Sequence, residues 1–337
     1  SQQVMETIEV PWTESRMTSA EFASFLHTDR YAGFHPAEPP LMRLTLVQLD
    51  AGDWRLVWTF HHLLLDGRSI TAVLQEVFSD YDGVPDSMAG PAPLPPWLHW
   101  QAALEHESTL PFWRDFLKGT KGPSPLVIDK LGTLTPAAAR AEADEVLTEA
   151  ETVGLAQLAQ SCGVTMNTLV QAAWALLISR YSGEESVTFG ATRACRHIPF
   201  PGAGSLCAML INTVPVCTVV SGEEKLIPWL QSLRNAWTGM RPCELTPLPV
   251  IRRAAGLPGG QAIFNHLVVF EHDDYTGVLR SRNPSWSHRR FDLKELTTVP
   301  LTLQACGGPA LRLHCAFDTS QFDPAMIRRM LGHAAHL

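Results

Sequence analysis

Two runs of strand-forming residues lie close together near the start of the chain. Pro40–Leu49 and Trp54–Phe60 are rich in apolar residues, and the four residues between them are typical of a tight turn, so we expect a β-hairpin. After Asp66-Gly67 the pattern changes to the i, i+3, i+4, i+7 spacing of one helix face. The apolar residues at this spacing are Ile70, Val73, Leu74, Val77, Phe78 and Tyr81. They predict an amphipathic helix with Ser69 as its N-cap.

A segment rich in proline and glycine, Gly83–Trp97, predicts a surface crossing after this helix. It is followed by a helical stretch, Trp97–Gly119, and then by the loop TKGPSP. A chain of 337 residues is long enough for two lobes. We place the boundary between them at this loop, so that the N-terminal lobe covers residues 1–120 and the C-terminal lobe covers residues 121–337.

The second half of the chain mixes helical and strand-like segments. Two helical stripes are expected, one at Leu155, Leu158, Ala159 and Cys162, and one at Leu169, Ala172, Ala173, Leu176 and Leu177. The second stripe is apolar almost all round, which predicts a central helix. Strands are expected at Ser186–Thr192 and Ala262–His272, a hairpin around Gly307-Gly308, and a last helix with Asp323 as N-cap and Pro324 at its first position. Because strands arrive in hairpins, the predicted fold class is α/β with mixed sheets.

The composition is that of an ordinary globular protein, with 45% hydrophobic and 18% charged residues. A net charge of −8 without a basic stripe argues against a nucleic-acid binder, and no apolar run reaches membrane-spanning length. The N-terminus has no signal-peptide pattern, and the seven cysteines are scattered without CxxC pairs. We therefore expect free thiols in a reducing cytoplasm, and a zinc site is disfavoured.

Candidate chemistry is concentrated in HHLLLDG, residues 61–67, where the second strand of the hairpin ends. Common motifs such as GxSxG, GxxxxGK[ST], GxGxxG and HExxH are absent from the chain. His61 and His62 could bind a metal with Asp66, but neighbouring side chains on a strand point to opposite faces, which weakens this interpretation. The alternative for either ring is a hydrogen-bonded core histidine.

The acid of this segment also has more than one possible use. The Asp66 carboxylate can cap backbone amides of the following helix or pair with a distant arginine. Gly67 allows either a close backbone approach or a positive φ at the turn. The combination of a group that titrates near neutral pH with an acid that fixes local geometry favours chemistry over a plain Asp-Gly turn.

The segment HHLLLDG is similar to the HHxxxDG signature of nonribosomal peptide synthetase condensation domains, a motif that other acyltransferases also carry. The similarity continues along the chain, in order. It covers GFHPAEPPLMRLTL, VTMNTLVQAAWALLISRYSGEESVTFGATRACR, AMLINTVPV, IFNHLVVFEH and the closing VPLTL and LRLHCAFDTSQFD. By this resemblance the chain is identified as a member of the superfamily, and it begins inside the family's N-terminal lobe.

The resemblance implies two lobes like chloramphenicol acetyltransferase, arranged in a V with a channel between them. It implies an enzyme, an acyltransferase that forms an amide bond between a carrier-bound acyl or peptidyl thioester and an aminoacyl acceptor in antibiotic or secondary-metabolite biosynthesis. No cofactor is bound in this scheme, because the substrates are carried on the 4'-phosphopantetheine of carrier proteins. The implied partners are donor and acceptor carrier domains and a neighbouring adenylation domain, with no nucleic acid and no membrane.

Two other functions stay open at this point. One is a same-fold acyltransferase that forms an ester or amide with a small soluble acceptor or a CoA donor. The other is a non-catalytic domain on which carrier proteins dock. Cyclisation relatives would replace HHxxxDG with DxxxxD, and epimerisation relatives usually place a tryptophan shortly after the serine, so condensation is favoured over both.

The resemblance also assigns roles to residues. His62 is the catalytic residue, His61 packs beside it, Asp66 pairs with Arg196, and Gly67 serves the turn. No metal is involved. His62 could take the proton released after attack, stabilise the tetrahedral intermediate or orient the amine, and the sequence leaves these roles open.

The sequence departs from the family pattern at three positions near these residues. Arg68 stands where an aromatic residue is frequent, and Cys195 and Ala208 stand where glycine is usual. These changes could reshape the channel without removing the active histidine.

Overall fold

The computed structural model describes residues 7–50, 52–83, 90, 92–126, 140–258, 260–272 and 275–337. The chain forms two compact units. The first unit consists of Ser1–Leu94 and Ser205–Leu210, and the second unit of Pro95–Gly204 and Ile211–Leu337. The first part of the first unit ends at Leu94, earlier than the boundary at residue 120 that we placed from the sequence. The first unit also includes a short later segment, Ser205–Leu210. The proposed V of two lobes stays a prediction.

The early boundary has a physical cause in the aromatic residues that follow it. The Trp97 ring is 5.4 Å from that of Phe200 and 5.3 Å from that of Trp100, measured between ring centroids. Trp113 is fully buried in a cluster that contains Val214. These contacts attach the segment after Leu94 to the second unit, although a proline- and glycine-rich stretch precedes it.

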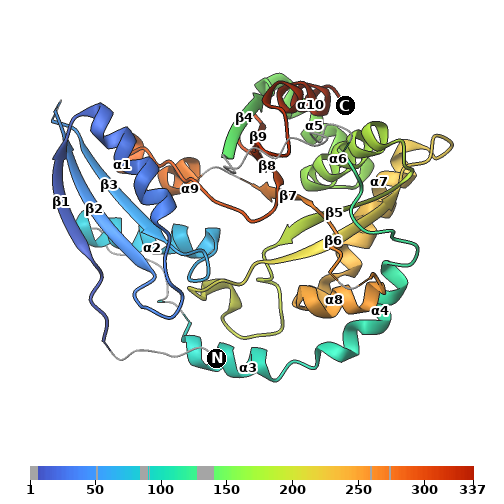
Figure 1. Ribbon diagram of the computed structural model, residues 1–337, viewed down its shortest axis with the longest axis horizontal. Helices are drawn as coiled ribbons and strands as arrows, with labels where there is room; N and C mark the ends of the chain where they lie inside the picture. Colours follow the sequence, from blue (N-terminus) through green and yellow to red (C-terminus); the bar gives the residue numbers. More distant parts are fainter. Residues whose placement is uncertain are drawn as a thin grey trace. The chain divides into compact units, whose positions relative to one another are not determined.

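The first unit is a three-stranded sheet with two helices (Figure 1). Its elements are β1 (Trp12–Met17), α1 (Ser19–Ala32), β2 (Met42–Leu49), β3 (Trp54–Phe60) and α2 (Gly67–Tyr81). The strands lie in the order β1-β2-β3, with β1 parallel to β2 and β2 antiparallel to β3. The predicted hairpin and the following helix are confirmed, whereas the sequence analysis missed β1 and α1.

Helix α1 contacts the sheet through a half-buried carboxylate. Thr18 and Glu21 form a capping box at its start. Asp29, on α1, accepts hydrogen bonds from Arg43 Nε of β2 at 2.5 Å and from the Thr59 hydroxyl of β3. One charged side chain therefore links the helix to two strands.

The N-cap of α2 is Asp66, which corrects the prediction of Ser69. The Asp66 carboxylate accepts the backbone N–H of Ser69 at 2.9 Å, so that Ser69 is the third residue of the helix. A side chain at the N-cap reaches the N–H two or three residues ahead, and Asp meets this requirement as well as Ser. Pattern alone could not choose between two good capping residues three positions apart.

The second unit is built on a six-stranded mixed sheet in the order β4-β9-β8-β7-β5-β6. Its strands are β4 (Arg140–Val146), β5 (Ser186–Arg193), β6 (Asn212–Val219), β7 (His266–Glu271), β8 (Leu301–Cys306) and β9 (Arg312–Asp318). The pairs β5–β7 and β7–β8 are parallel, and the other pairs are antiparallel. This arrangement confirms the predicted α/β class with mixed sheets.

Of the helices of the second unit, α6 and α10 pack directly against this sheet (Figure 1). The described helices of the unit are α3 (Leu94–Ala102), α4 (Leu110–Phe116), α5 (Glu149–Cys162), α6 (Met166–Ser182), α7 (Leu226–Gly239), α8 (Leu248–Ala255), α9 (Tyr275–Arg282) and α10 (Pro324–His336). Short 3-10 turns lie at His106–Thr109, Ala203–Ser205, Arg241–Cys243 and Pro284–His288. The predicted helical stretch over Trp97–Gly119 is divided into separate helices: α3 ends at Ala102, and α4 begins at Leu110, where Pro111 favours a new helix start.

The core of the second unit lies around α6. Trp174 of α6 is fully buried, together with Phe189 of β5 and Leu301 of β8. The prediction of a central, apolar helix is therefore confirmed. Leu158 of α5 is 41% exposed, so the predicted stripe on that helix is narrower than expected. Across the described ranges no single helix is long and apolar enough to cross a membrane, and α5 and α6, bent by 99°, reach that length and composition only as a pair.

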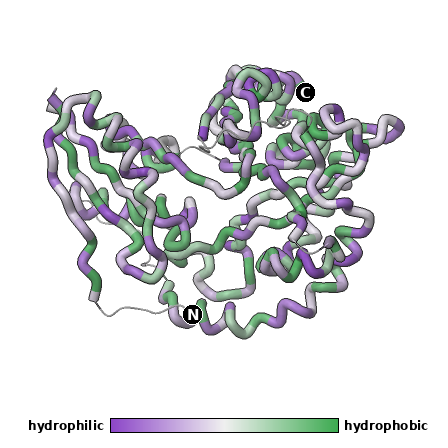
Figure 2. Tube along the Cα trace, in the orientation of Figure 1, coloured by the Kyte–Doolittle hydropathy of each residue, from purple (hydrophilic) through white to green (hydrophobic). Residues whose placement is uncertain are grey.

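The first unit has much less buried apolar surface than the second. Polar and apolar positions mix along β2 and β3 (Figure 2). The register places Trp12 beside Leu44, Leu44 opposite Trp58, and Leu46 opposite Leu56, all on one face. On that face Trp12 is 52% exposed and Leu56 is 45% exposed. Within the part of the chain that the structure describes, both hydrophobic core clusters belong to the second unit.

This difference predicts unequal costs for the same substitution in the two units. Trp174→Ala removes a fully buried ring and should cost about 3–5 kcal/mol of unfolding free energy. Trp54→Ala removes a ring that is 54% exposed on β3 and should cost about 1 kcal/mol or less. Urea unfolding followed by circular dichroism measures both, and equal losses would contradict the difference in burial.

Candidate active site

The two histidines of the motif lie just beyond a strand, not within it. Strand β3 ends at Phe60, and the His61 N–H donates to the carbonyl of Leu41 at 2.9 Å. The N–H of Leu64 then donates to the His61 carbonyl at 3.0 Å, which closes a turn. The expectation of two histidines on opposite faces of one strand is therefore wrong, because the alternation of side chains applies to extended backbone only.

The ring of His61 has a structural hydrogen bond. Its Nδ1 accepts the backbone N–H of Leu63 at 3.0 Å, so the neutral ring carries its proton on Nε2. Among the residues that the structure describes, no group of three or more His, Cys, Asp and Glu side chains could hold a metal ion.

His62 is half-buried in the same turn, and its Nδ1 atom is buried. An imidazole has only two ring nitrogens that can exchange a proton. The burial of Nδ1 places this nitrogen poorly for contact with a substrate.

The Asp66 carboxylate is 1% exposed and accepts hydrogen bonds on both oxygens. Oδ1 accepts the backbone N–H of Ser69 at 2.9 Å and lies 2.8 Å from the Ser69 hydroxyl. Oδ2 accepts the backbone N–H of Leu210 at 3.1 Å. A carboxylate held in this way is engaged in fixing the backbone.

Gly67 is the first residue of α2. A residue inside a right-handed helix has a negative φ, so the positive φ considered for this glycine is not present. Gly67 lies where the chain passes from the motif into the helix.

Arg196 lies in the second unit and is 5% exposed. Its Nη1 donates to the carbonyl of Ala203 at 3.1 Å, within the loop that follows β5. Because Asp66 belongs to the first unit and Arg196 to the second, their pairing stays a prediction.

Cys195, next to Arg196, has a φ of 48° and is the one residue other than glycine with a positive φ among the described residues. This left-handed conformation favours glycine, which agrees with glycine being usual at this position of the family. The thiol is buried, and its Sγ lies 3.5 Å from the carbonyl oxygens of Arg193 and Glu244. These contacts help to hold a backbone conformation that costs about 1 kcal/mol or more for a side chain with a Cβ.

A buried ion pair stands at the end of β5, three residues before Arg196. Arg193 Nε and Nη2 lie 2.9 and 2.8 Å from Glu244 Oε2, and both side chains are 6% exposed. Arg193 Nη1 donates to the carbonyl of Trp237 at 2.7 Å, and its guanidinium lies over the Trp237 ring. The Asn212 amide donates to the Glu244 carbonyl at 2.8 Å. This cluster therefore ties β5, β6 and α7 together.

This pair was not predicted from the sequence. Arg193 and Glu244 are 51 residues apart, and neither lies in a recognisable motif. The signal that could have found them is an arginine at the end of an otherwise apolar buried strand, since a buried charge requires a partner.

Two buried ionisable groups of the second unit, His266 and Cys217, do not fit a catalytic role. Burial lowers the pKa of His266 to about 4, so this histidine is neutral near pH 7, and its Nε2 lies 3.0 Å from the Ser124 carbonyl. Burial raises the pKa of Cys217 to about 11, which keeps its thiol protonated and unreactive. None of the seven cysteines, all of which lie in the described ranges, is joined in a disulfide.

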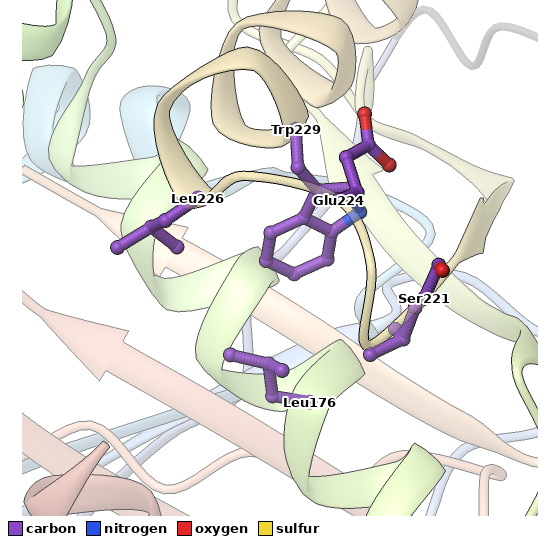
Figure 3. Close-up of a pocket in the computed structure, with 6 residues that line it drawn as sticks. Leu176, Ser221, Glu224, Leu226 and Trp229 are labelled. Atoms are coloured by element: carbon purple, nitrogen blue, oxygen red, sulfur yellow. The ribbon is translucent and has the colours of Figure 1, made fainter.

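One surface pocket of the second unit lies between α6 and α7 (Figure 3). Its volume is about 100 Å³, and it is lined by Leu176, Val220, Ser221, Glu224, Leu226 and Trp229. Pockets for small ligands are typically about 300–1,000 Å³. This pocket is too small for a substrate arm and contains no residue of the motif.

The comparisons with known proteins agree with the motif. The family model for the condensation domain matches residues 1–337. The chain belongs to the condensation-domain family. It is 36% identical over 328 residues to one of the linear gramicidin synthase proteins of Brevibacillus parabrevis, a match that covers 92% of this chain and 6% of that protein. It is 30% identical over 336 residues to a chondramide synthase of Chondromyces crocatus, over 96% of this chain and 8% of that protein.

Solved structures show the same fold. A four-domain nonribosomal peptide synthetase bound to AMP and glycine matches with a TM-score of 0.83 at 15% identity, over 98% of this condensation domain and 27% of that chain. The X-domain from teicoplanin biosynthesis matches with a TM-score of 0.80 at 16% identity, over 99% of this chain and 79% of that one. The family's condensation domains form amide bonds and work with carrier and adenylation domains of their synthetases.

We predict that Asp66→Asn disturbs the motif although it preserves shape. One carboxylate oxygen becomes an NH₂ group, which then faces a backbone N–H of Ser69 or Leu210 and leaves a buried donor unsatisfied. The expected loss is about 1–3 kcal/mol of unfolding free energy. Asp80→Asn, on the exposed part of α2, is the matched control and should lose about 0.5 kcal/mol or less. Equal stability of both variants in urea unfolding would contradict the geometry.

We also predict that Glu244→Gln is severely destabilising. It leaves the Arg193 guanidinium buried without its counter-charge, which typically costs about 3–5 kcal/mol. The matched control is Glu107→Gln, which breaks the exposed pair with Arg253 and should cost about 1 kcal/mol or less. Chemical unfolding measures both, and a small loss for Glu244→Gln would show that the pair does not hold the end of β5.

Proposed function

We propose that this condensation domain joins a carrier-bound acyl or peptidyl thioester to the amine of an aminoacyl acceptor held on a second carrier. The amine nitrogen attacks the thioester carbonyl carbon, a C–N bond forms and the C–S bond breaks. The pantetheine sulfur leaves and ends as a thiol, after taking up the proton that the amine loses. The product is an amide on the acceptor carrier, and the reaction needs no oxidant, reductant or metal.

The observation that carries this proposal is the set of hydrogen bonds within the HHxxxDG turn. Both oxygens of the Asp66 carboxylate accept hydrogen bonds, and the His61 Nδ1 accepts a backbone N–H. His62 is the histidine that the family motif assigns to catalysis; its Nδ1 is buried, and we propose Nε2 as the nitrogen that exchanges a proton with substrate. Membership of the condensation-domain family supports the same assignment.

We infer that His62 accepts the proton that the nitrogen loses after attack, and that it orients the amine. An α-amino group titrates at about 7.7–8.0, so part of the acceptor is neutral near pH 7 without any base. The tetrahedral intermediate, in contrast, carries a proton on nitrogen that must leave before the amide is formed. An imidazole side chain is suited to accept it as a general base.

The proposed substrates are carried on the 4'-phosphopantetheine of donor and acceptor carrier domains, with an adenylation domain of the same synthetase loading the acceptor. The chain spans 6% of the length of the linear gramicidin synthase protein and 8% of that of the chondramide synthase, which supports partners in other domains of such a synthetase. The seven cysteines are not joined in disulfides, which favours a reducing compartment, and we propose that the reaction takes place in the cytoplasm.

We predict that His62→Ala abolishes amide formation, while His61→Ala retains it at reduced stability. The His62 variant loses the nitrogen that handles the proton, whereas the His61 variant loses one hydrogen bond to the Leu63 N–H, worth about 1 kcal/mol. The measurement is intact-mass spectrometry of a donor and an acceptor carrier, each loaded, after incubation with each variant. Thermal unfolding shows that both variants are folded.

Three outcomes decide between the functions. Transfer of the acyl mass to the acceptor carrier by the wild type supports condensation. Product formed only from a CoA thioester or a soluble acceptor points to the same-fold acyltransferase instead. Carrier binding without transfer identifies a docking domain. Wild-type turnover by the His62→Ala variant would remove His62 from the mechanism.

A further inference from the structure

We propose that Ser69 is a positioning residue, which holds the segment Ser205–Leu210 against the HHxxxDG turn and so keeps the turn in its reactive geometry. This proposal rests on the proposed function. It assigns a role to a serine that the motif assignment left out.

The segment Ser205–Leu210 reaches the first unit from a distant part of the sequence. The chain before it, up to Gly204, and the chain after it, from Ile211, belong to the second unit. These six residues therefore need specific contacts to remain in the first unit. One end is held by Ala92, whose N–H donates to the Ser205 carbonyl at 3.3 Å and which forms a parallel bridge with Leu206.

The other end is held by side chains of the motif and of the first turn of α2. The Ser69 hydroxyl accepts the Ala208 N–H at 3.0 Å and lies 2.8 Å from the Ala208 carbonyl oxygen. It thus meets both backbone groups of one residue, as a neighbouring strand would. Two residues later, the Leu210 N–H donates to Asp66 Oδ2. Ser69 and Asp66 together accept backbone N–H groups of this segment, as the carbonyls of a neighbouring strand would.

Burial makes these hydrogen bonds costly to lose. Ser69 and Asp66 are each 1% exposed, Ala208 is 8% exposed and Leu210 is 3% exposed. Removing the hydroxyl leaves the N–H and carbonyl of Ala208 without this partner in a site that water reaches poorly. The segment should then move away from the turn more often.

The same hydroxyl connects the segment to the catalytic turn. The Ser69 oxygen lies 2.8 Å from Asp66 Oδ1 as well as from the Ala208 carbonyl, and its single proton can be donated to one of them at a time or shared. Asp66 in turn ends the loop that begins at His61 and His62. A change at Ser69 therefore reaches His62 through Asp66, without contact between Ser69 and the reacting atoms.

The test compares Ser69→Ala with Ser69→Cys and with a control, Ser79→Ala. Cysteine preserves the shape of serine and retains a weak donor, so it should have an intermediate effect. Ser79 is also a buried serine of α2, so Ser79→Ala tests the loss of a hydroxyl elsewhere on the same helix. Thermal unfolding verifies that each variant is folded.

Two readouts are combined. Hydrogen exchange followed by mass spectrometry reports on the peptide that contains residues 205–210. Turnover with loaded carrier proteins gives kcat and KM. For Ser69→Ala we expect faster exchange of this peptide and a fall of kcat by about tenfold, with KM for the donor carrier unchanged, since a loss of about 1.4 kcal/mol at the transition state has this size. Ser79→Ala should change neither.

Each other outcome overturns a definite part of the proposal. Unchanged exchange in Ser69→Ala and Ser69→Cys would show that the serine does not hold the segment. Faster exchange with an unchanged kcat would show that it holds the segment but positions nothing for catalysis. If the wild type forms no product, the proposed function falls, and the exchange measurement alone decides whether Ser69 holds Ser205–Leu210.

Discussion

The site depends on one carboxylate whose hydrogen bonds are directed mainly at backbone. Asp66 starts α2 by accepting the Ser69 N–H, and it binds the distant segment Ser205–Leu210 by accepting the Leu210 N–H. Because the residue is 1% exposed, these hydrogen bonds form away from water, where a charged acceptor binds N–H groups strongly. The turn that contains His61 and His62 ends at this carboxylate, so its geometry follows from that of Asp66.

A second buried charge has a similar use in the second unit. Glu244 neutralises Arg193 at the end of β5, while its carbonyl accepts the amide of Asn212 at the start of β6. The loop with Cys195 and Arg196 leaves from this point, and the positive φ of Cys195 turns the chain there. In both units a buried acid therefore sets the direction of a loop that leaves a strand, which is a different task from proton transfer.

The two units differ in how they are stabilised. The second has a continuous apolar core around Trp174, whereas the first relies on polar links such as Asp29 with Arg43 and Ser69 with Ala208. Polar links fix geometry well but contribute little net stability, since they replace hydrogen bonds to water. A site built on such links is sensitive to single-atom changes. We therefore expect that the loss of the Ser69 hydroxyl or of one Asp66 carboxylate oxygen alters its geometry.

From the sequence alone the β2–β3 hairpin, the central helix α6, the β8–β9 hairpin and the HHxxxDG motif could be predicted, because each depends on residues close together in the chain. The N-cap of α2, the break before Pro111 and the turn around His61 and His62 were misjudged, since local patterns permit more than one boundary. The contacts of Leu210 with Asp66, Ala208 with Ser69 and Arg193 with Glu244 were decided by the tertiary structure alone. Their partners are 144, 139 and 51 residues apart, and a hydrogen bond across such a distance leaves no periodic signal in the sequence.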